Sequence, residues 1–215
     1  MKAVSDLPLF PRQVHDRLKL RLPGADLQAT MSPRGRPSAS DLNNFECREA
    51  SVLALLHPHH GELSVVLIER PGHLSKHPGQ IAFPGGRRES GESRLDAALR
   101  ETMEEIGQDP ARIAVLGALT ALYIPPSGFC VYPYVGWTES LDELILDPSE
   151  VASAFSAPLR LFVDGPMDLM DMPRLKRSVP RYQVAGHSVW GATAMMLAEL
   201  GAVLEPVLPL PVDCG

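Results

Sequence analysis

The pattern of apolar and polar positions predicts a mixture of strands and helices. Short runs rich in Val, Leu, Ile and Tyr are typical of strands, and longer runs with apolar residues three and four apart are typical of helices. The predicted strands lie at about 50–56, 63–69, 113–121, 129–136, 151–156 and 179–184. The predicted helices lie at about 93–106 and 189–200, with a short one near 159–163. This mixture indicates an α/β fold.

The length and composition indicate one domain. The 215 residues are 45% apolar, which is enough to bury a full core, and the sequence has no convincing linker or internal repeat. We expect the domain at 46–205, after an N-terminal extension at 1–45 and before a C-terminal tail at 206–215. Within the extension, Phe10, Val14 and Leu18 recur at helical spacing, which predicts one helix.

The helix predicted at 93–106 has recognisable ends. Ser93 is suited to an N-cap, and Gly107 stands where a left-handed residue commonly ends a helix. At about 100° per residue, one apolar stripe is expected. Its members are Leu95, Ala98, Leu99, Thr102, Met103 and Ile106.

Three glutamates of this helix, Glu101, Glu104 and Glu105, are expected on an arc roughly opposite the apolar stripe. Like charges three or four residues apart repel by roughly 0.2 to 0.5 kcal/mol per pair. A hard divalent cation such as Mg²⁺ takes carboxylate oxygens as ligands and would turn this repulsion into binding energy. A solvated acidic face is the alternative, and the residues before the helix favour the cation.

The run from 86 to 107 resembles the Nudix box, which forms a loop-helix-loop metal site. Its charged positions and glycines are all present, as Gly86, Glu92, Arg100, Glu101, Glu104, Glu105 and Gly107. Two apolar positions depart from the pattern, with Thr102 and Gln108 in their places. The resemblance implies a Nudix-type α/β/α sandwich with a mixed sheet. It also implies an enzyme that hydrolyses phosphoric anhydrides with Mg²⁺ or Mn²⁺.

The resemblance also implies roles for individual residues. Glu104 and Glu105 would be primary metal ligands, and Glu101 would be a ligand or the base for the attacking water. Arg100 would orient these glutamates, and the Gly86 carbonyl would also reach a metal. Glu92 would brace the loop through hydrogen bonds.

Many Nudix enzymes use a further acidic residue outside the box. Glu139, Glu143 and Glu150 are the candidates here, and we select Glu150 as the catalytic one. A charge on a surface loop is the alternative for this residue.

The segment VLIERPGHLSKHPGQIAFPGG, directly before the box, resembles the signature of the coenzyme A pyrophosphatase branch. Ser75 stands where that signature usually has arginine. The PSGF segment after the box resembles a substrate-side loop of the same branch, although a tight turn is the plain alternative. The substrate-binding residues implied are Arg70, Lys76, His77, Gln80, Ser127 and Phe129.

Three functions stay open. The first is hydrolysis of coenzyme A or its thioesters to adenosine 3′,5′-bisphosphate and 4′-phosphopantetheine products. The second is hydrolysis of another nucleotide, such as ADP-ribose, a dinucleotide or a nucleoside triphosphate. The third is a non-catalytic module that senses nucleotides, although such a module does not need the full set of carboxylates. Ser75 keeps the second function open.

The resemblance implies a small nucleotide as the substrate, and charge and hydropathy argue against nucleic acid and membranes as partners. A net charge of −6 argues against broad binding to nucleic acid, so positive charge must be local, with Arg70, Lys76, Arg87 and Arg88 as candidates. No apolar run approaches the roughly 18 residues of a membrane span, and the N-terminus lacks the apolar core of a secretory signal. We therefore expect a cytoplasmic protein that does not bind membranes. A homodimer is one option for its oligomeric state.

The cysteines and histidines give weaker signals. Cys47, Cys130 and Cys214 are odd in number and lack a short paired spacing, so we expect reduced thiols. The segment with His57, His59 and His60 is expected to be a hairpin turn, although histidine also binds metals readily.

Overall fold

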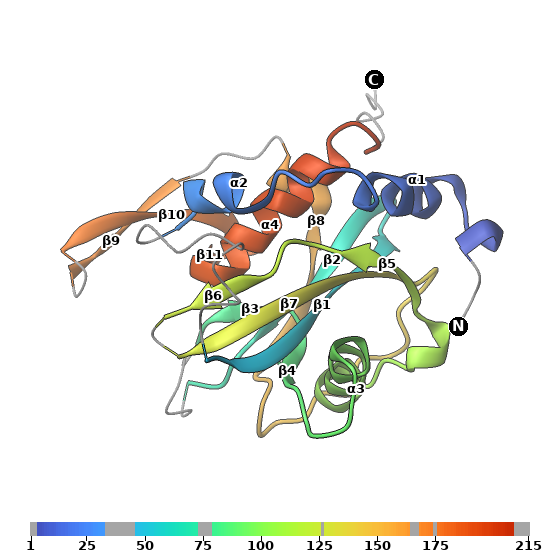
Figure 1. The fold of residues 1–215 in the computed structure, drawn as a ribbon, viewed down its shortest axis with the longest axis horizontal. Coiled ribbons are helices and arrows are strands. Elements are labelled where there is room, and N and C mark those ends of the chain that lie inside the picture. Colours follow the sequence, from blue (N-terminus) through green and yellow to red (C-terminus); the bar gives the residue numbers. More distant parts are fainter. Residues whose placement is uncertain are drawn as a thin grey trace.

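A computed structural model of the chain describes residues 4–32, 46–72, 79–125, 127–163, 168–173 and 176–208. Its centre is a mixed sheet of eight strands covered by helices on both faces (Figure 1). The strands are β1 (Arg48–His59), β2 (Glu62–Glu69), β3 (Ile81–Ala82), β4 (Gly85–Arg87), β5 (Ala114–Ala118), β6 (Leu122–Ile124), β7 (Phe129–Trp137) and β8 (Ser153–Pro158).

The order of the main sheet is β3-β2-β1-β7-β5, with β4 paired to β1, β6 to β7 and β8 to β2. The two central strands β1 and β7 are parallel, from Arg48 opposite Phe129 to Leu56 opposite Trp137. The other pairings are antiparallel. The expected mixed sheet is thus confirmed.

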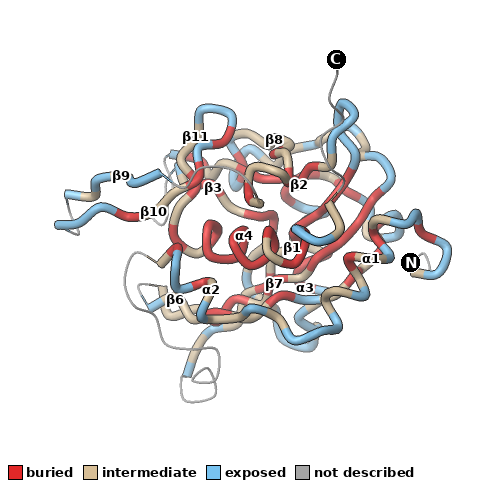
Figure 2. The backbone as a smooth tube through the Cα atoms, turned by 90° about the horizontal axis from the view of Figure 1, so that it is seen from above, coloured by how far each residue is buried: buried red, intermediate tan, exposed pale blue. Residues whose placement is uncertain are grey.

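Side chains alternate between two apolar layers along the central strands, as the pleat of a strand requires. Leu53 and Leu55 face helix α3 (Arg94–Ile106), whereas Ala54 and Leu56 face the layer of helix α4 (Gly191–Leu204). Helix α4 is buried along almost its whole length (Figure 2). The expected α/β/α sandwich follows from these two layers.

A smaller sheet has the order β11-β10-β9, with strands β9 (Asp168–Met172), β10 (Arg177–Val184) and β11 (His187–Trp190). The β9–β10 pair projects from the body of the molecule in both ribbon and tube views (Figures 1 and 2). Three short 3₁₀ helices complete the described elements, at Val4–Asp6, Pro110–Arg112 and Leu159–Phe162.

The N-terminal helices α1 (Leu9–Leu18) and α2 (Gly24–Thr30) pack on the α4 side of the sheet. Val14 is fully buried in the same apolar cluster as the central strands, and the Phe10 ring meets the Trp137 ring edge-on at 5.8 Å. The helix predicted from the spacing of Phe10, Val14 and Leu18 is therefore confirmed.

Helix α2 is attached to the body through the buried carboxylate of Glu199 on α4. This carboxylate accepts hydrogen bonds from the Gly24 N–H at 3.1 Å and the Gln28 amide at 2.8 Å. It also accepts bonds from the Thr120 N–H at 3.1 Å and hydroxyl at 2.6 Å. Four donors thus satisfy a charge that would be costly to bury alone.

The sequence predictions differ from the structure mainly at the edges of elements. The strand expected at 113–121 ends at Ala118 after a register shift between Val115 and Gly117, and β6 follows as a separate strand. Helix α2 and the strands β3, β4, β6, β9 and β11 were not predicted; β3, β4, β6 and β11 are too short to show a clear alternation. Among the described residues, no helix is long and apolar enough to cross a membrane.

Candidate metal centre

Helix α3 begins and ends as its sequence predicts. The Ser93 hydroxyl accepts a hydrogen bond from the Asp96 N–H at 3.1 Å, which caps the first turn. Gly107 adopts φ 74° at the other end, and its N–H donates to the Met103 carbonyl at 2.9 Å. The helix therefore begins and ends where the sequence predicts, with Glu101, Glu104 and Glu105 in its last two turns.

Two residues of α3 lie on other faces than expected. Glu105 is buried, with only 2% of its surface exposed, whereas Met103 is 55% exposed. At about 100° per residue, Glu105 falls about a quarter-turn from the centre of the apolar stripe, beside Ala98, and not opposite the stripe. The prediction that all three glutamates lie on an arc roughly opposite the apolar stripe is therefore wrong for Glu105.

The glycine loop before α3 brings backbone directly against these carboxylates. Strand β4 pairs with β1, with Gly86 opposite Ser51, and the Gly85 N–H donates to Glu105 Oε2 at 2.8 Å. A Cβ atom on Gly86 would lie 2.4 to 2.5 Å from the carboxylate atoms of Glu101. A side chain at position 86 would therefore displace the Glu101 carboxylate from its present place.

Three carboxylates converge beside this loop. Glu101, Glu105 and Glu150 each offer an oxygen, and these atoms all lie within 4.8 Å of one another. Glu150 reaches the group from the exposed turn before β8. The structure therefore brings together two glutamates of the box and the residue that we selected outside it.

The electrostatics of this carboxylate group fit a cation. Burial raises the pKa of Glu105 to about 8, and burial also raises the pKa of Glu101. Among the described residues, buried Glu105 Oε1 has no hydrogen-bond partner, and Arg70 Nη1 lies 3.9 Å from it. An unpartnered buried oxygen among three carboxylates matches the oxygen ligand set of a hard divalent cation.

Arg100 links the remaining charges of the box. Its guanidinium binds both oxygens of Glu92, at 2.9 and 3.1 Å, and also contacts Glu101 at 3.0 Å and Glu104 at 2.8 Å. The Arg100 pairing lowers the pKa of Glu92 to about 2, and Glu92 also accepts the Glu89 N–H at 2.6 Å. Glu92 thus braces the loop as expected.

Glu104 has a different environment from the other two glutamates. Its side chain is 57% exposed and pairs with Arg100. In the described part of the chain, the close carboxylate group consists of Glu101, Glu105 and Glu150. The role of Glu104 as a primary metal ligand stays a prediction.

Of the residues expected to bind substrate, the structure describes Arg70, Gln80, Ser127 and Phe129. Arg70 and Gln80 form the base of a loop, in which the Arg70 N–H donates to the Gln80 carbonyl and the Gly79 N–H to the Arg70 carbonyl, both at 3.0 Å. Lys76 and His77, together with Ser75, lie outside the described residues. Arg70 thus joins this signature loop to the carboxylate group.

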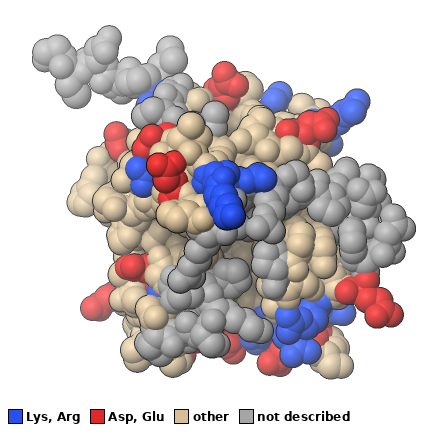
Figure 3. Space-filling view, turned by 90° about the vertical axis from the view of Figure 1, so that its left-hand side faces the viewer, with Lys and Arg blue, Asp and Glu red and all other residues tan. Residues whose placement is uncertain are grey.

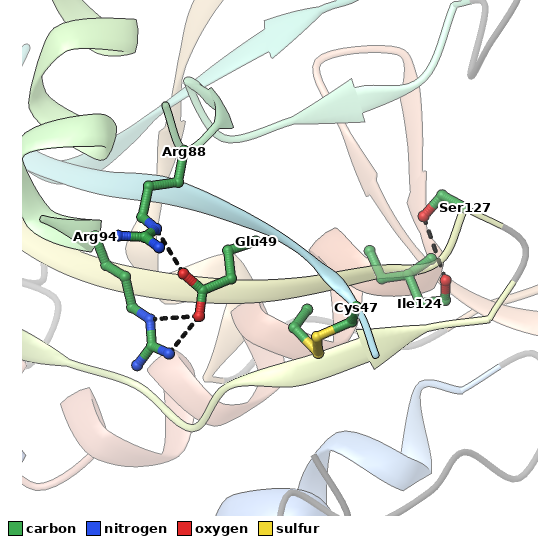
Figure 4. The surroundings of a disulfide bond; sticks show 7 residues. Cys47, Glu49, Arg88, Arg94, Ile124 and Ser127 are labelled. Atoms are coloured by element: carbon green, nitrogen blue, oxygen red, sulfur yellow. Dashed lines mark hydrogen bonds and ion pairs between the residues drawn. A yellow bond between two sulfur atoms is a disulfide. The ribbon is translucent and has the colours of Figure 1, made fainter. Parts of the chain in front are cut away.

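Ser127 and Phe129 lie at the start of β7, where Arg48 contacts both. The Arg48 guanidinium donates to the Ser127 carbonyl at 2.5 Å and stands 4.3 Å from the centre of the Phe129 ring. The Ser127 hydroxyl donates to the Ile124 carbonyl at 3.3 Å, as a turn before a strand allows (Figure 4). Their role in substrate binding stays a prediction.

A disulfide joins Cys47, just before β1, to Cys130 in β7, with the Cα atoms 5.6 Å apart (Figure 4). The expectation of reduced thiols at these two positions is therefore wrong; Cys214 lies outside the described residues. The two cysteines are 83 residues apart and meet because β1 and β7 are parallel neighbours. Disulfides are typical of oxidising compartments, and the cytoplasmic location stays a prediction.

Sequence reasoning missed a second charged cluster near the box, on the same face of the sheet. Glu49 of β1 pairs with Arg88 at 2.6 Å and with Arg94 (Figure 4). The Arg94 guanidinium also lies 3.6 Å from the centre of the Tyr132 ring. Arg88, a candidate for local positive charge, thus shares the single carboxylate of Glu49 with Arg94. Acidic and basic side chains form small separate groups on the face shown in Figure 3.

The segment with His57, His59 and His60 is the β1–β2 hairpin, as expected. His59 pairs with Glu62 across the turn, and His60 adopts φ 48°. Buried His57 contacts the Ser156 hydroxyl at 3.0 Å through Nε2.

The layered mixed sheet and the convergent carboxylates define an α/β protein with a loop-helix-loop metal-site geometry. A family model for the NUDIX domain matches residues 48–176, more than half of the chain. Nudix hydrolase 3 of Caenorhabditis elegans is 30% identical over 201 residues, which cover 85% of this chain and 82% of that protein. The chain belongs to the Nudix hydrolase family, so the family and the enzyme class expected from the sequence are confirmed.

Other relatives agree with this assignment. The Enterobacter protein named uncharacterized Nudix hydrolase NudL is 36% identical over 163 residues, which cover 71% of this chain and 81% of that protein. Among solved structures, the Nudix hydrolase RenU of Mycobacterium smegmatis has a TM-score of 0.55 at 18% identity, covering 77% of this chain and 90% of that one. An Ap4A hydrolase of C. elegans has a TM-score of 0.52 at 16% identity, covering 74% and 98%. At these identities the two structures show the fold alone.

Proposed function

We propose that this Nudix hydrolase cleaves the pyrophosphate bond of coenzyme A or its thioesters. The products would be adenosine 3′,5′-bisphosphate and a 4′-phosphopantetheine compound. The observation that carries the proposal is the segment that resembles the coenzyme A signature and leads directly into a box with all of its charged residues and glycines. The position of Arg70 supports it, because this residue of the signature lies 3.9 Å from Glu105.

The reaction adds one water across a phosphoric anhydride. A P–O bond forms to the water oxygen, the bridging P–O bond breaks, and the leaving phosphate takes the bonding electron pair. The water loses a proton, so a base must stand beside the carboxylate group. Charge neutralisation on the bridging phosphates and acidification of the attacking water are the chemistry that a Mg²⁺ or Mn²⁺ ion held by Glu101, Glu105 and Glu150 would supply.

The side chains of the site divide the remaining work. Glu101 is either a ligand of this ion or the base for the attacking water, and the Arg100 guanidinium orients its carboxylate through a hydrogen bond of 3.0 Å. Arg70 extends from the signature loop towards Glu105, where a guanidinium could also bind an anionic phosphate. Burial of Glu105 reduces competition from water for its free oxygen.

Product identification tests the proposal. The purified protein with millimolar Mg²⁺ or Mn²⁺ should convert coenzyme A to the two named products, which chromatography with mass detection separates. A chelator should stop the reaction, and Glu105→Gln serves as the inactive control. Strong turnover of ADP-ribose without detectable cleavage of coenzyme A would overturn the substrate and favour the alternative that Ser75 keeps open.

A further inference from the structure

The loop that carries Glu150 is attached to the C-terminal end of α3. The Ile145 N–H donates to the Ile106 carbonyl at 3.2 Å, and the Asp147 N–H donates to the Glu105 carbonyl at 3.1 Å. Both acceptors belong to the last turn of the helix, where carbonyls lack partners within the helix. Glu105 therefore holds this loop through its backbone carbonyl, and its side chain belongs to the carboxylate group.

This attachment requires the glycine that ends the helix. A Cβ atom on Gly107 would lie 2.9 Å from the Cβ of Ile145, and Gly107 also has a positive φ. The close approach of the loop to α3 is thus built into the sequence, although Ile145 itself is 71% exposed.

Asp147 closes the turn that presents Glu150. Its Oδ1 accepts hydrogen bonds from the Ser149 N–H at 2.8 Å and the Ser149 hydroxyl at 2.7 Å. Its carbonyl accepts bonds from the Glu150 N–H at 3.1 Å and the Val151 N–H at 2.8 Å. The chain then enters β8 through a bond from the Ala152 N–H to the Glu69 carbonyl at 2.8 Å.

We propose that Asp147 is a positioning residue that holds the Glu150 carboxylate against Glu101 and Glu105, where the three together bind a divalent cation. This inference rests on the metal centre of the proposed function. Asp147 connects the two sides of the centre, because its N–H is bonded to Glu105 and its carbonyl to the backbone of Glu150. Its Oδ1 is bonded to Ser149, and Asp147 is not one of the three carboxylates that converge, so we assign it to orienting a ligand.

The need for such a residue follows from the charges. Glu150 is exposed and belongs to a turn, so a loosened turn would let its carboxylate move away from two like charges. The unpartnered Oε1 of Glu105 marks the place that a cation would fill. Removing a group that orients a metal ligand typically weakens metal affinity by about 10- to 100-fold.

The test measures Mn²⁺ binding to the metal-free, full-length protein by titration calorimetry, independently of turnover. Asp147→Ala and Glu150→Gln should each weaken binding by about tenfold or more. The double variant should bind no more weakly than Glu150→Gln, because Asp147 acts through Glu150. Asp147→Asn keeps an Oδ1 acceptor for Ser149 and should bind almost as well as the wild type.

Asp109 provides a matched control, because its Oδ1 accepts the Ala111 N–H at 2.8 Å in a comparable turn that does not carry Glu150. Asp109→Ala should leave Mn²⁺ affinity unchanged. Should Asp147→Ala fail to fold, Ser149→Ala removes only the hydroxyl bond, and we expect a loss of about two- to threefold that disappears when Glu150 is already glutamine.

The outcomes separate two kinds of failure. If neither Glu105→Gln nor Glu150→Gln changes Mn²⁺ binding, the proposed metal centre is wrong. The metal centre stands but the positioning role of Asp147 is wrong in either of two cases. In the first, Glu150→Gln weakens Mn²⁺ binding and Asp147→Ala does not. In the second, both variants weaken it and the double variant loses the sum of the two effects.

Discussion

Replacing Glu105 with glutamine gives opposite effects on stability and activity if this residue is a buried metal ligand. The side chain is 2% exposed, and burial raises its pKa from 4.5 to about 8 in the absence of metal. Between these two pH values the folded protein binds more protons than the unfolded chain, so this group lowers stability as the pH rises. The stability that proton binding gives is present in full only below the unfolded pKa.

The magnitude follows from one unit of pKa being worth about 1.36 kcal/mol. Between pH 5 and pH 7.5 the wild type should lose about 3 kcal/mol through this group, whereas glutamine does not titrate. The unfolding free energy of metal-free Glu105→Gln should therefore rise by about 3 kcal/mol relative to the wild type over this range. Urea unfolding with a chelator, at both pH values, measures the difference.

Metal and activity should respond in the reverse direction. Mn²⁺ should stabilise the wild type far more than the glutamine variant, because a ligand that binds only the folded state shifts the unfolding equilibrium. The variant should lose at least about a hundredfold in kcat, roughly 2.7 kcal/mol of transition-state stabilisation. The shift of the thermal midpoint with Mn²⁺ tests the first expectation, and the steady-state kcat tests the second.

Leu99→Ala is the control from the apolar face of the same helix, where Leu99 is 8% exposed. It should cost about 2 to 5 kcal/mol at both pH values and keep the metal response. Near-normal turnover of Glu105→Gln, with a metal response like that of the wild type and a stability difference independent of pH, would refute the assignment of Glu105.

Three further predictions concern other parts of the molecule. Cys47→Ser should lower the free energy of unfolding in non-reducing urea titrations by about 4 kcal/mol, because the disulfide closes a long loop; equal stability with and without a reductant would contradict the bond. Glu199→Ala should cost at least about 3 kcal/mol, because it removes the acceptor shared by half-buried Gly24 and Thr120 and buried Gln28. Hydrogen exchange in α2 should accelerate, and unchanged exchange with a loss below about 1 kcal/mol would count against that anchor. Ser75→Arg should lower KM for coenzyme A more than it changes kcat, and an effect on kcat alone would show that position 75 does not contact the substrate.

The sequence predicted α3 well because its signals are local. A capping serine, a terminal glycine and a repeating apolar stripe all lie within one continuous run, and the structure shows both ends where they were expected. The predicted apolar stripe included Met103, which is exposed, and left out Glu105, which is buried at the opposite edge of the stripe. Which residue at the edge of a stripe is buried depends on the neighbouring loop, here the one with Gly85.

Contacts between distant segments could not be predicted in the same way. The Cys47–Cys130 bond depends on β1 and β7 being parallel neighbours, and no spacing of cysteines encodes that arrangement. The acceptor role of Glu199 likewise depends on α2 packing against α4. The selection of Glu150 came from its place before a predicted strand, but its proximity to Glu105 depends on a loop bonded to the end of α3.

The central claim is that Glu101, Glu105 and Glu150 together hold a divalent cation, and anomalous diffraction from crystals soaked in Mn²⁺ tests it most directly. A strong anomalous peak should lie in contact with carboxylate oxygens of Glu101 and Glu105, with Glu150 on the same ion or on a second ion beside it. The peak should disappear in Glu105→Gln crystals treated identically. A Mn²⁺ peak elsewhere on the protein, with none between these carboxylates, would contradict the account.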